Sequence, residues 1–353
     1  MNRRTFLTTA VVASASTAFA QAITPSLLTR GVVLYPFDLS LADWPERCAR
    51  AGIGTIALHA ARRLDVLADF IASDAGQSFL SRCQKLGIAI EYELHAMSEL
   101  LSRELYYKDP TLFRIDASGR RNQDFNCNPF SATALDIIAE KAVKYARIFK
   151  PTTHRYFYWP DDGAQWDSSA AGKELNAGAQ ALLVENHILK ALRREVDPQA
   201  QLSHISYHHT LAAPNQVKPE SGIFLEFAPI VRDYTAPITD RAAKTRRPAG
   251  AHPDPATNGG YLDILKANMR VFGAETTQVL EYWLDVSMFS KWTRPAIKLP
   301  WNEAVCRADI AAYRALGVRH ITTFATYIDA DYARIHGDPQ PVLDAYGKAL
   351  SSP

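Results

Sequence analysis

Acidic residues in two aromatic-rich segments are the strongest candidates for chemistry in this sequence. The segment HRYFYWPDDG, residues 154–163, ends an aromatic run on Asp161 and Asp162, and TQVLEYWLD, residues 277–285, contains Glu281. Hydrolysis of a glycoside needs one carboxyl group to protonate the leaving oxygen and a second group to meet the developing positive charge. Closely spaced carboxylates raise one another's proton affinity, so one can stay protonated near neutral pH. We therefore predict Asp161, Asp162 and Glu281 as catalytic residues.

The adjacent pair of acids has a second interpretation. Paired acids at the end of a strand resemble those of hexosaminidases in which the acetamido group of the substrate acts as the nucleophile. One acid then orients the acetamido group and the other is the general acid, so that Glu281 only binds. A surface turn or a helix cap is the structural alternative for a bare Asp-Asp pair. The sequence leaves these alternatives open.

Further polar and aromatic side chains lie at or near the ends of the predicted strands, where a sugar would be bound. Aromatic rings cover the C–H faces of a sugar, while polar groups bond its hydroxyls. Charged residues inside apolar strands must also be paired or hydrogen-bonded to persist. The predicted substrate-binding residues are His59, Glu93, His95, Tyr158, Trp159, Tyr207, His208, Glu226, Arg232, Asp233, Tyr282, Trp283, Asp285, Trp292 and Tyr327.

Eight apolar runs, separated mostly by helical patterns, must position these residues. The runs span 31–38, 53–60, 88–96, 154–162, 201–210, 222–230, 277–285 and 319–328. Nearly continuous apolar strands that alternate with helices are typical of a parallel sheet covered on both faces. Eight such units predict an α/β fold, a single-domain (β/α)8 TIM barrel, whose chemistry lies at the carboxyl ends of the strands. The link between the fifth and sixth strands is too short for an ordinary helix, so that unit should be degenerate.

The predicted helices cover 41–52, 64–86, 131–150, 176–196, 260–273 and 302–317, with a short one after Pro339. Ser131 and Asn302 are predicted N-caps. The stretch 97–130 is expected to be irregular, and 234–258 to be a loop.

The beginning of the chain has the pattern of an export signal. Arg3 and Arg4 precede a weakly apolar stretch that ends in Ala18-Phe19-Ala20, as in a bacterial twin-arginine signal peptide. We predict that residues 1–20 are this signal, that 21–353 form the barrel domain, and that the protein is periplasmic or secreted. No membrane contact is expected beyond the signal.

Composition narrows the choice of ligands. The formal net charge of +2 over 353 residues gives no reason to expect nucleic acid as a partner. None of the four cysteines forms a CxxC pair, so a zinc or redox motif is unsupported. No cofactor and no metal are predicted, and the expected partner is a carbohydrate substrate.

The chain also resembles a known family. The runs YELHAMSELL, NQDFNCNP, HRYFYWPDDG, LLVENHILKALR, VKPESGIFLEFAPIVRD and VLEYWLDVSMFSKW, with the spacing DI-x-x-Y-x-x-LG from Asp309 to Gly317, resemble the bacterial domain of unknown function 4838 family. That family is grouped with TIM-barrel glycoside hydrolases and is similar to α-glucuronidases. The resemblance covers about residues 85–335 and implies a glycosidase-like barrel.

The resemblance also implies site residues, namely those that lie inside the matching motifs. They are Glu93, His95, Asp161, Asp162, Glu226, Arg232, Asp233, Glu281, Tyr282 and Asp285. The sequence departs from the family pattern in AQWDSSAAGKE, residues 164–174, where relatives have cysteines and this chain has none. The resemblance therefore implies no metal or disulfide role for this loop.

Three hypotheses for function remain at this point. The first is an exported glycoside hydrolase acting on a plant or bacterial glycan, with an acidic or N-acetylated sugar as a candidate unit. The second is a metal-dependent sugar isomerase or epimerase, whose ligands would come from Glu93, His95, His209, Glu226 and Glu281. The third is an inactive carbohydrate-binding barrel, for which a mouth filled by residues 234–258 would be typical.

Overall fold

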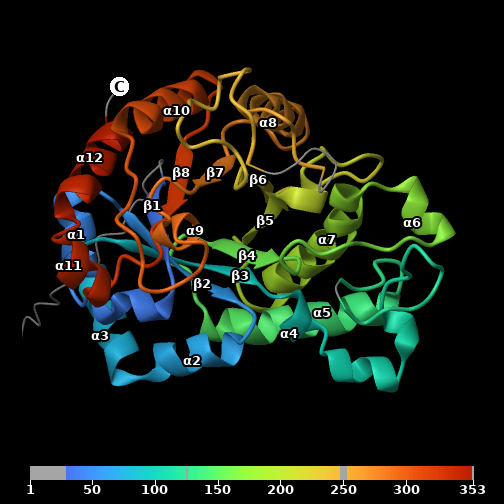
Figure 1. Ribbon diagram of the computed structural model, residues 1–353. Helices are drawn as coiled ribbons and strands as arrows, with labels where there is room; N and C mark the ends of the chain where they lie inside the picture. The colour runs from blue at the N-terminus through green and yellow to red at the C-terminus, as the bar shows by residue number, and fades with distance from the viewer. Residues whose placement is uncertain (1–28, 125, 247–252, 352–353) are drawn as a thin grey trace, which may run out of the picture.

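A computed structural model describes residues 29–124, 126–246 and 253–351 (Figure 1). The predicted signal peptide, residues 1–20, lies outside the described residues. No helix in the described ranges is long and apolar enough to cross a lipid bilayer.

Eight parallel strands close into a barrel in sequence order, each paired with its neighbours and the last with the first. The strands are β1 (Arg30–Leu34), β2 (Thr55–Ala61), β3 (Ala89–His95), β4 (Arg155–Trp159), β5 (Gln201–Ser206), β6 (Ile223–Phe227), β7 (Gln278–Glu281) and β8 (His320–Phe324). This confirms the (β/α)8 prediction, and it fixes the carboxyl ends of all strands at one mouth of the barrel.

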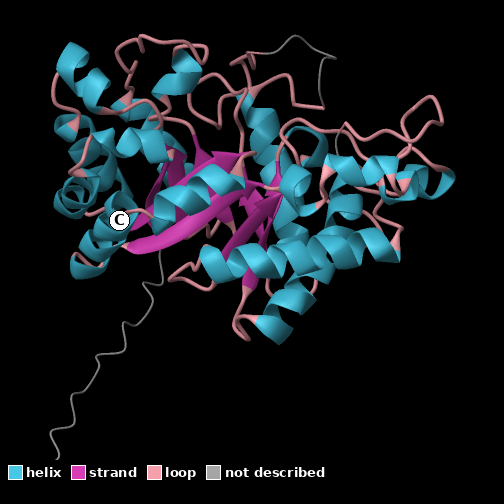
Figure 2. Ribbon diagram, turned by 90° about the horizontal axis from the view of Figure 1, so that it is seen from below, coloured by secondary structure: helices cyan, strands magenta, loops and turns pink. Residues whose placement is uncertain are grey.

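Helices surround the strands on all sides, as Figure 2 shows. They are α1 (Trp44–Ala51), α2 (Leu64–Ala72), α3 (Asp74–Lys85), α4 (Met97–Leu100), α5 (Ala132–Ile148), α6 (Ala170–Glu174), α7 (Ala177–Glu195), α8 (Asn258–Phe272), α9 (Val286–Phe289), α10 (Glu303–Ala315), α11 (Ala330–His336) and α12 (Gln340–Ser351). Short 3-10 turns are η1 (Pro36–Ser40), η2 (Arg103–Tyr107), η3 (Pro110–Leu112) and η4 (His208–Thr210).

Local sequence signals explain where several helices begin and end. The side chains of Ser131 and Asn302 accept hydrogen bonds from the backbone N–H groups at the starts of α5 and α10, as predicted. Gly52 ends α1 in the left-handed region at φ 70°, which glycine adopts without a steric penalty. The predicted helix 64–86 is wrong as a single element, because Ser73 is extended and caps a second helix, α3.

The connection between β5 and β6 lacks an α-helix, as predicted. Every residue of this connection is described, and it contains only the one-turn η4 before the chain enters β6. The β3–α5 connection, by contrast, is long and carries α4, η2 and η3. The mouth is therefore bounded by an extended loop after β3 and by a short link after β5.

Candidate active site

Two aspartates at the mouth come from opposite sides of the barrel. Asp162 follows β4, is exposed, and accepts a hydrogen bond of 2.9 Å from the Tyr207 hydroxyl. Asp285 follows β7 and is only 4% exposed. Its Oδ1 accepts hydrogen bonds of 2.5 Å from each of the hydroxyls of Ser287 and Thr326. The hydrogen bonds from Ser287, Met288 and Thr326 all go to this one oxygen, Oδ1.

Two tyrosines lie within electrostatic reach of both aspartates. Burial raises the pKa of Tyr35, and the charges of Asp285 and Asp162 raise it further. Burial likewise raises the pKa of Tyr282, with smaller contributions from Tyr207, Asp285 and Asp162. Both carboxyl groups therefore lie near the same two phenols. The sequence prediction placed Asp285 and Tyr282 in the site, but Tyr35, at the end of β1, was not selected.

The surroundings of the two carboxyl groups move their pKa values apart. Burial raises the pKa of Asp285 and outweighs the hydrogen bonds from Ser287 and Thr326, which lower it. At Asp162, burial opposes ionisation, but His95 and the Tyr207 hydroxyl outweigh it and lower the pKa. A carboxyl whose pKa is raised and another whose pKa is lowered are the complementary pair that acid–base catalysis requires.

Two histidines lie beside each other at the same basin, with ring centroids 5.7 Å apart. Nδ1 of His59 lies 2.6 Å from the Glu93 carbonyl oxygen, and Nδ1 of His95 lies 2.7 Å from the Pro160 carbonyl oxygen. A carbonyl can only accept, so each Nδ1 must carry a proton, and Nε2 of the neutral ring is an acceptor. Burial, followed by the nearby His95, lowers the pKa of His59 to about 3, so this ring stays neutral. Neither Nε2 atom has a hydrogen-bond partner in the described part of the chain.

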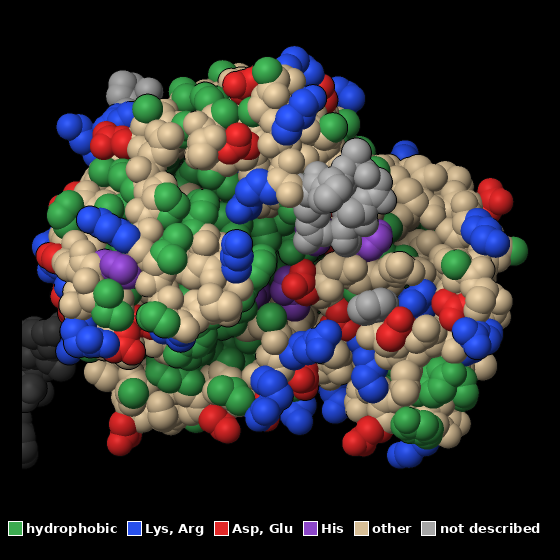
Figure 3. Space-filling view, viewed as in Figure 1, with side chains coloured by type: hydrophobic (Ala, Val, Ile, Leu, Met, Phe, Trp, Pro, Cys, Tyr) green, Lys and Arg blue, Asp and Glu red, His purple; other side chains and the backbone are tan. Residues whose placement is uncertain are grey.

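Aromatic rings form the walls of this basin. The Tyr35 ring stacks on Phe37 with ring centroids 5.2 Å apart, and Tyr282 stacks on Phe324 at the same separation. The Trp159 ring lies beneath the two imidazoles, 5.0 Å from His95. Figure 3 shows an apolar hollow at the centre of this face, with acidic and histidine side chains at one edge.

Asp161 does not face the basin with its neighbour. Its carboxylate is buried, accepts a hydrogen bond of 2.9 Å from the Ser98 N–H and forms an ion pair with Arg103. These contacts tie the end of β4 to the long β3–α5 connection. The prediction that both adjacent acids work on the substrate is therefore wrong in its geometry: Asp161 anchors a loop, and Asp162 alone reaches the mouth.

Glu281 points away from the mouth, which contradicts its predicted position opposite the strand-four acids. Its fully buried carboxylate accepts a hydrogen bond from the Tyr313 hydroxyl of α10 and pairs with Arg232 Nε at 3.2 Å. Arg232 also pairs with Asp309 of α10, which accepts a 2.9 Å hydrogen bond from the Trp283 indole. Arg232, Glu281 and Trp283 thus join β7 to a helix and do not line the basin.

Glu93 and Glu226 lie inside the barrel, below the basin. The Gln278 side-chain amide donates to Glu93 Oε1 at 3.3 Å and to Glu226 Oε1 at 3.2 Å, while the Trp159 indole donates to Glu226 Oε2 at 2.7 Å. Burial raises the pKa of Glu226 to about 8, and burial together with Glu226 raises the pKa of Glu93 well above its usual value. These two predicted binding residues form an interior network that supports Trp159.

Three more predicted binding residues have other partners. The Tyr158 hydroxyl donates to the Ala142 carbonyl of α5 at 3.2 Å, so this ring packs outside the barrel. Asp233 accepts hydrogen bonds from Thr235 within a local turn. His208 Nδ1 lies 3.0 Å from Asp254 Oδ2, in the loop before α8. Of the predicted residues, those at the basin are Asp162, His59, His95, Trp159, Tyr207, Tyr282 and Asp285. Trp292 and Tyr327 lie at its outer rim, where the Tyr327 hydroxyl reaches the Trp292 carbonyl.

The residues suggested as metal ligands do not converge. Glu281 faces α10, whereas Glu93 and Glu226 share the barrel interior. Among the described residues there is no group of three or more histidine, cysteine, aspartate or glutamate side chains arranged to hold a metal ion. All four cysteines are buried as free thiols.

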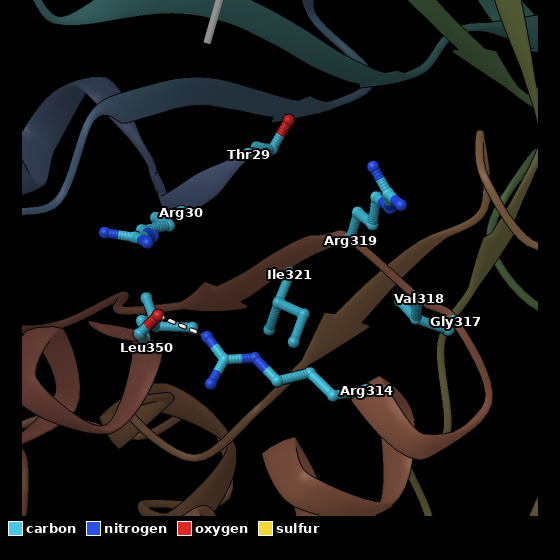
Figure 4. A pocket seen from close by; sticks show the side chains of 8 residues that line it. All are labelled: Thr29, Arg30, Arg314, Gly317, Val318, Arg319, Ile321 and Leu350. Atoms are coloured by element: carbon cyan, nitrogen blue, oxygen red, sulfur yellow. Dashed lines mark hydrogen bonds between the residues drawn. The ribbon is translucent and has the colours of Figure 1, made fainter. Parts of the chain in front are cut away.

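A cavity of about 240 Å³ lies at the opposite end of the barrel (Figure 4). Arg30, Arg314 and Arg319 line it, and Arg314 donates a hydrogen bond to the Leu350 carbonyl. It is separate from the basin, because Arg30 and Arg319 lie at the amino ends of β1 and β8. Chemistry in barrels of this class occurs at the carboxyl ends, so this cavity is not the candidate active site.

Comparison with known proteins supports the fold. No family model matches the chain, and no curated protein sequence is similar to it. Solved structures with a similar fold include the catalytic domain of β-amylase from Paenibacillus polymyxa, at TM-score 0.50 and 10% identity over 93% of this chain and 100% of that one. The family 42 β-galactosidase Gan42B has TM-score 0.52 at 10% identity, over 92% of this chain and 57% of that one.

An exo-β-1,4-mannosidase from Opitutaceae bacterium strain TAV5 has TM-score 0.45 at 13% identity, over 92% of this chain and 61% of the mannosidase. The chain thus spans less than two thirds of the length of this mannosidase and of the galactosidase. The architecture is that of the TIM barrels found in glycoside hydrolases.

Proposed function

We propose that this protein is a glycoside hydrolase whose catalytic carboxyl groups are Asp162 and Asp285. The observation that carries the proposal is their electrostatic contrast: burial raises the pKa of Asp285, whereas His95 and Tyr207 overcome burial and lower the pKa of Asp162. Both groups act on the same two tyrosines, Tyr35 and Tyr282. The two catalytic acids still follow strands four and seven, as the sequence predicted, but Asp285 takes the role that was predicted for Glu281.

In this mechanism, a sugar lies in the basin with its apolar face against the aromatic walls. Asp285 protonates the glycosidic oxygen through Oδ2 as the bond to the anomeric carbon breaks. The ionised Asp162 stabilises the positive charge that develops at that carbon, and it either attacks the carbon or removes a proton from an attacking water. The hydroxyl of Tyr207 holds the Asp162 carboxylate through its 2.9 Å hydrogen bond.

The imidazoles define which sugar groups fit the basin. Because the neutral His59 ring carries its proton on Nδ1, its Nε2 is an acceptor and binds a sugar hydroxyl that donates a hydrogen bond. A neutral hydroxylated ring therefore suits this part of the site. The suggested substrate-assisted mechanism receives less support, because Asp161 is already paired with Arg103 and cannot orient an acetamido group.

Export and family membership form part of the proposal. The twin arginine at Arg3-Arg4 supports export to the periplasm or beyond, where plant and bacterial glycans are available. The motifs shared with the bacterial domain of unknown function 4838 family support membership in that family, and its grouping agrees with a glycosidase-like barrel.

A screen of p-nitrophenyl glycosides and of plant and bacterial oligosaccharides tests this function. The wild type should hydrolyse at least one of them, and Asp162→Asn and Asp285→Asn should each lower kcat by about 10²–10⁴-fold. Asp161→Asn is the matched control, since it changes a neighbouring carboxyl that faces away from the basin. Wild-type activity in both basin variants, or no hydrolysis of any glycan, would refute the assignment.

A further inference from the structure

The rim of the basin between β8 and the β7–α10 connection contains an unusual group of backbone conformations. Lys291, Trp292 and Tyr327 have φ values of 53°, 54° and 68°, and none of them is glycine. Bulky L-residues rarely adopt this left-handed region, because their side chains crowd the backbone. Such conformations persist only where the surrounding structure enforces them, and they gather at functional sites.

Specific hydrogen bonds hold this rim in place. The Trp292 N–H donates to the Ser287 carbonyl at 2.7 Å, and the Tyr327 N–H donates to Asp38 Oδ1 at 2.8 Å. The Tyr327 hydroxyl reaches the Trp292 carbonyl at 3.4 Å, so the two segments are joined directly. The local strain is therefore maintained by contacts with Ser287 of α9 and Asp38 of η1.

Two aromatic side chains of this rim are exposed to solvent. Trp292 is 64% exposed and Phe37 is 45% exposed, although large aromatic side chains are usually buried. The rings continue from the basin: Phe37 stacks on Tyr35 at 5.2 Å and meets the edge of Tyr327 at 5.8 Å. An aromatic row thus runs from the candidate catalytic centre to the outer rim.

Arg294 adds polar donors to this row. Its guanidinium lies 4.1 Å from the Tyr327 ring centre and 5.1 Å from that of Phe37, and its Nη1 donates to Asp329 at 2.5 Å. Within the described residues, Arg294 forms no other hydrogen bond, and its side chain is 41% exposed. The remaining N–H groups are therefore available beside flat, exposed rings.

We propose that Phe37, Trp292, Arg294 and Tyr327 form a second sugar subsite, so that the preferred substrate is an oligosaccharide and not a single glycoside. This inference rests on the proposed hydrolase function, which places the first sugar in the basin. Flat rings cover the C–H face of the next sugar residue, and the guanidinium donates to its ring or hydroxyl oxygens. A rim built to bind a sugar explains why Trp292, an exposed aromatic residue, is held in a strained conformation.

The experiment compares substrates of two lengths. kcat and KM are measured for the wild type, Trp292→Ala and Arg294→Gln on p-nitrophenyl monoglycosides and on the matching tetrasaccharides of glucose, mannose, galactose and xylose. Tyr107→Ala is the matched control, since Tyr107 is an 80% exposed aromatic residue on η2, in the β3–α5 connection. Binding of the same tetrasaccharides is measured in parallel by isothermal titration calorimetry.

The expected result is an increase in KM and Kd of about tenfold for tetrasaccharides in Trp292→Ala, with monoglycoside kinetics unchanged. Tyr107→Ala should match the wild type on both substrates. If Trp292→Ala hydrolyses both the tetrasaccharides and the monoglycosides as fast as the wild type does, the subsite is refuted and the hydrolase assignment is not affected. Tetrasaccharide binding that depends on Trp292 without any hydrolysis would support the subsite and refute the hydrolase. Absence of both binding and hydrolysis would refute both.

Discussion

Replacing Arg232 with methionine should destabilise the fold strongly and in a pH-dependent way. The guanidinium is fully buried between two fully buried carboxylates, Glu281 at 3.2 Å and Asp309, so solvent screens neither interaction. Removing one partner of a buried ion pair typically costs about 3–5 kcal/mol, because a charge is left uncompensated. Methionine preserves much of the volume, so most of the loss will be electrostatic.

The sign of the pH dependence follows from the carboxyl groups. Burial raises the pKa of Glu281 to about 7 even with Arg232 present, and Arg232 is the main group that lowers it. In Arg232→Met the pKa rises further above the unfolded value, so the folded variant binds more protons than the unfolded chain. Its stability is therefore present at low pH and lost as pH rises through the folded pKa. The loss in free energy of unfolding relative to wild type should therefore be smaller at pH 5.5 than at pH 8.

Urea unfolding followed by tryptophan fluorescence at both pH values measures this effect. Glu281→Gln introduced into Arg232→Met should recover part of the lost stability, because it removes one of the two uncompensated charges. A loss below about 1 kcal/mol at pH 8, in the range of an exposed ion pair, would refute the reasoning. So would a Glu281→Gln single variant that is stable but has no hydrolase activity, since that would return Glu281 to the catalytic site.

Three further expectations concern the basin and the barrel interior. Asp161→Asn should lower the free energy of unfolding by about 1–3 kcal/mol and leave kcat near wild type. Asp162→Asn should lower kcat and leave the free energy of unfolding near wild type. Equal effects of the two variants on kcat would contradict the division of roles. The pH profile of kcat/KM should be bell-shaped, falling at low pH as Asp162 is protonated and at high pH as Asp285 ionises. Asp285→Asn should abolish the fall in kcat/KM at high pH. If that fall persists in the variant, another group and not Asp285 causes it. Gln278→Leu should destabilise the barrel by about 1–3 kcal/mol in urea titrations, because the interior carboxylates lose their amide donor; an unchanged midpoint would argue against the network.

The barrel itself could be predicted because its signals are local. Continuous apolar runs, N-caps at Ser131 and Asn302 and the short link after β5 each depend on neighbouring residues, and each is present in the structure. The break at Ser73 was missed, since serine is tolerated within helices and only its extended backbone reveals the cap.

Side-chain direction at β7 was the main error, and its cause is physical. Glu281, Trp283 and Asp285 alternate in sequence, as side chains on one face of a strand do, but β7 ends at Glu281 and the chain then turns, with the Asp285 N–H bonding the Tyr282 carbonyl. Alternation therefore cannot be extended to Asp285. A strand that is apolar on both faces gives no indication of which face is inner. Gln278, an amide that reaches the barrel interior, was the available signal, since it fixes Glu281 as outward-facing.

The dependence of activity on the leaving group tests the central claim most directly, because only a general acid is needed less when the leaving group is good. On a hydrolysed sugar, Asp285→Asn should turn over the 2,4-dinitrophenyl glycoside within about tenfold of wild type, and lose about 10²–10⁴-fold on an unactivated alkyl glycoside. Asp162→Asn should be impaired on both substrates. If Asp285→Asn loses activity equally on both, or on neither, Asp285 is not the proton donor and the proposed mechanism is wrong.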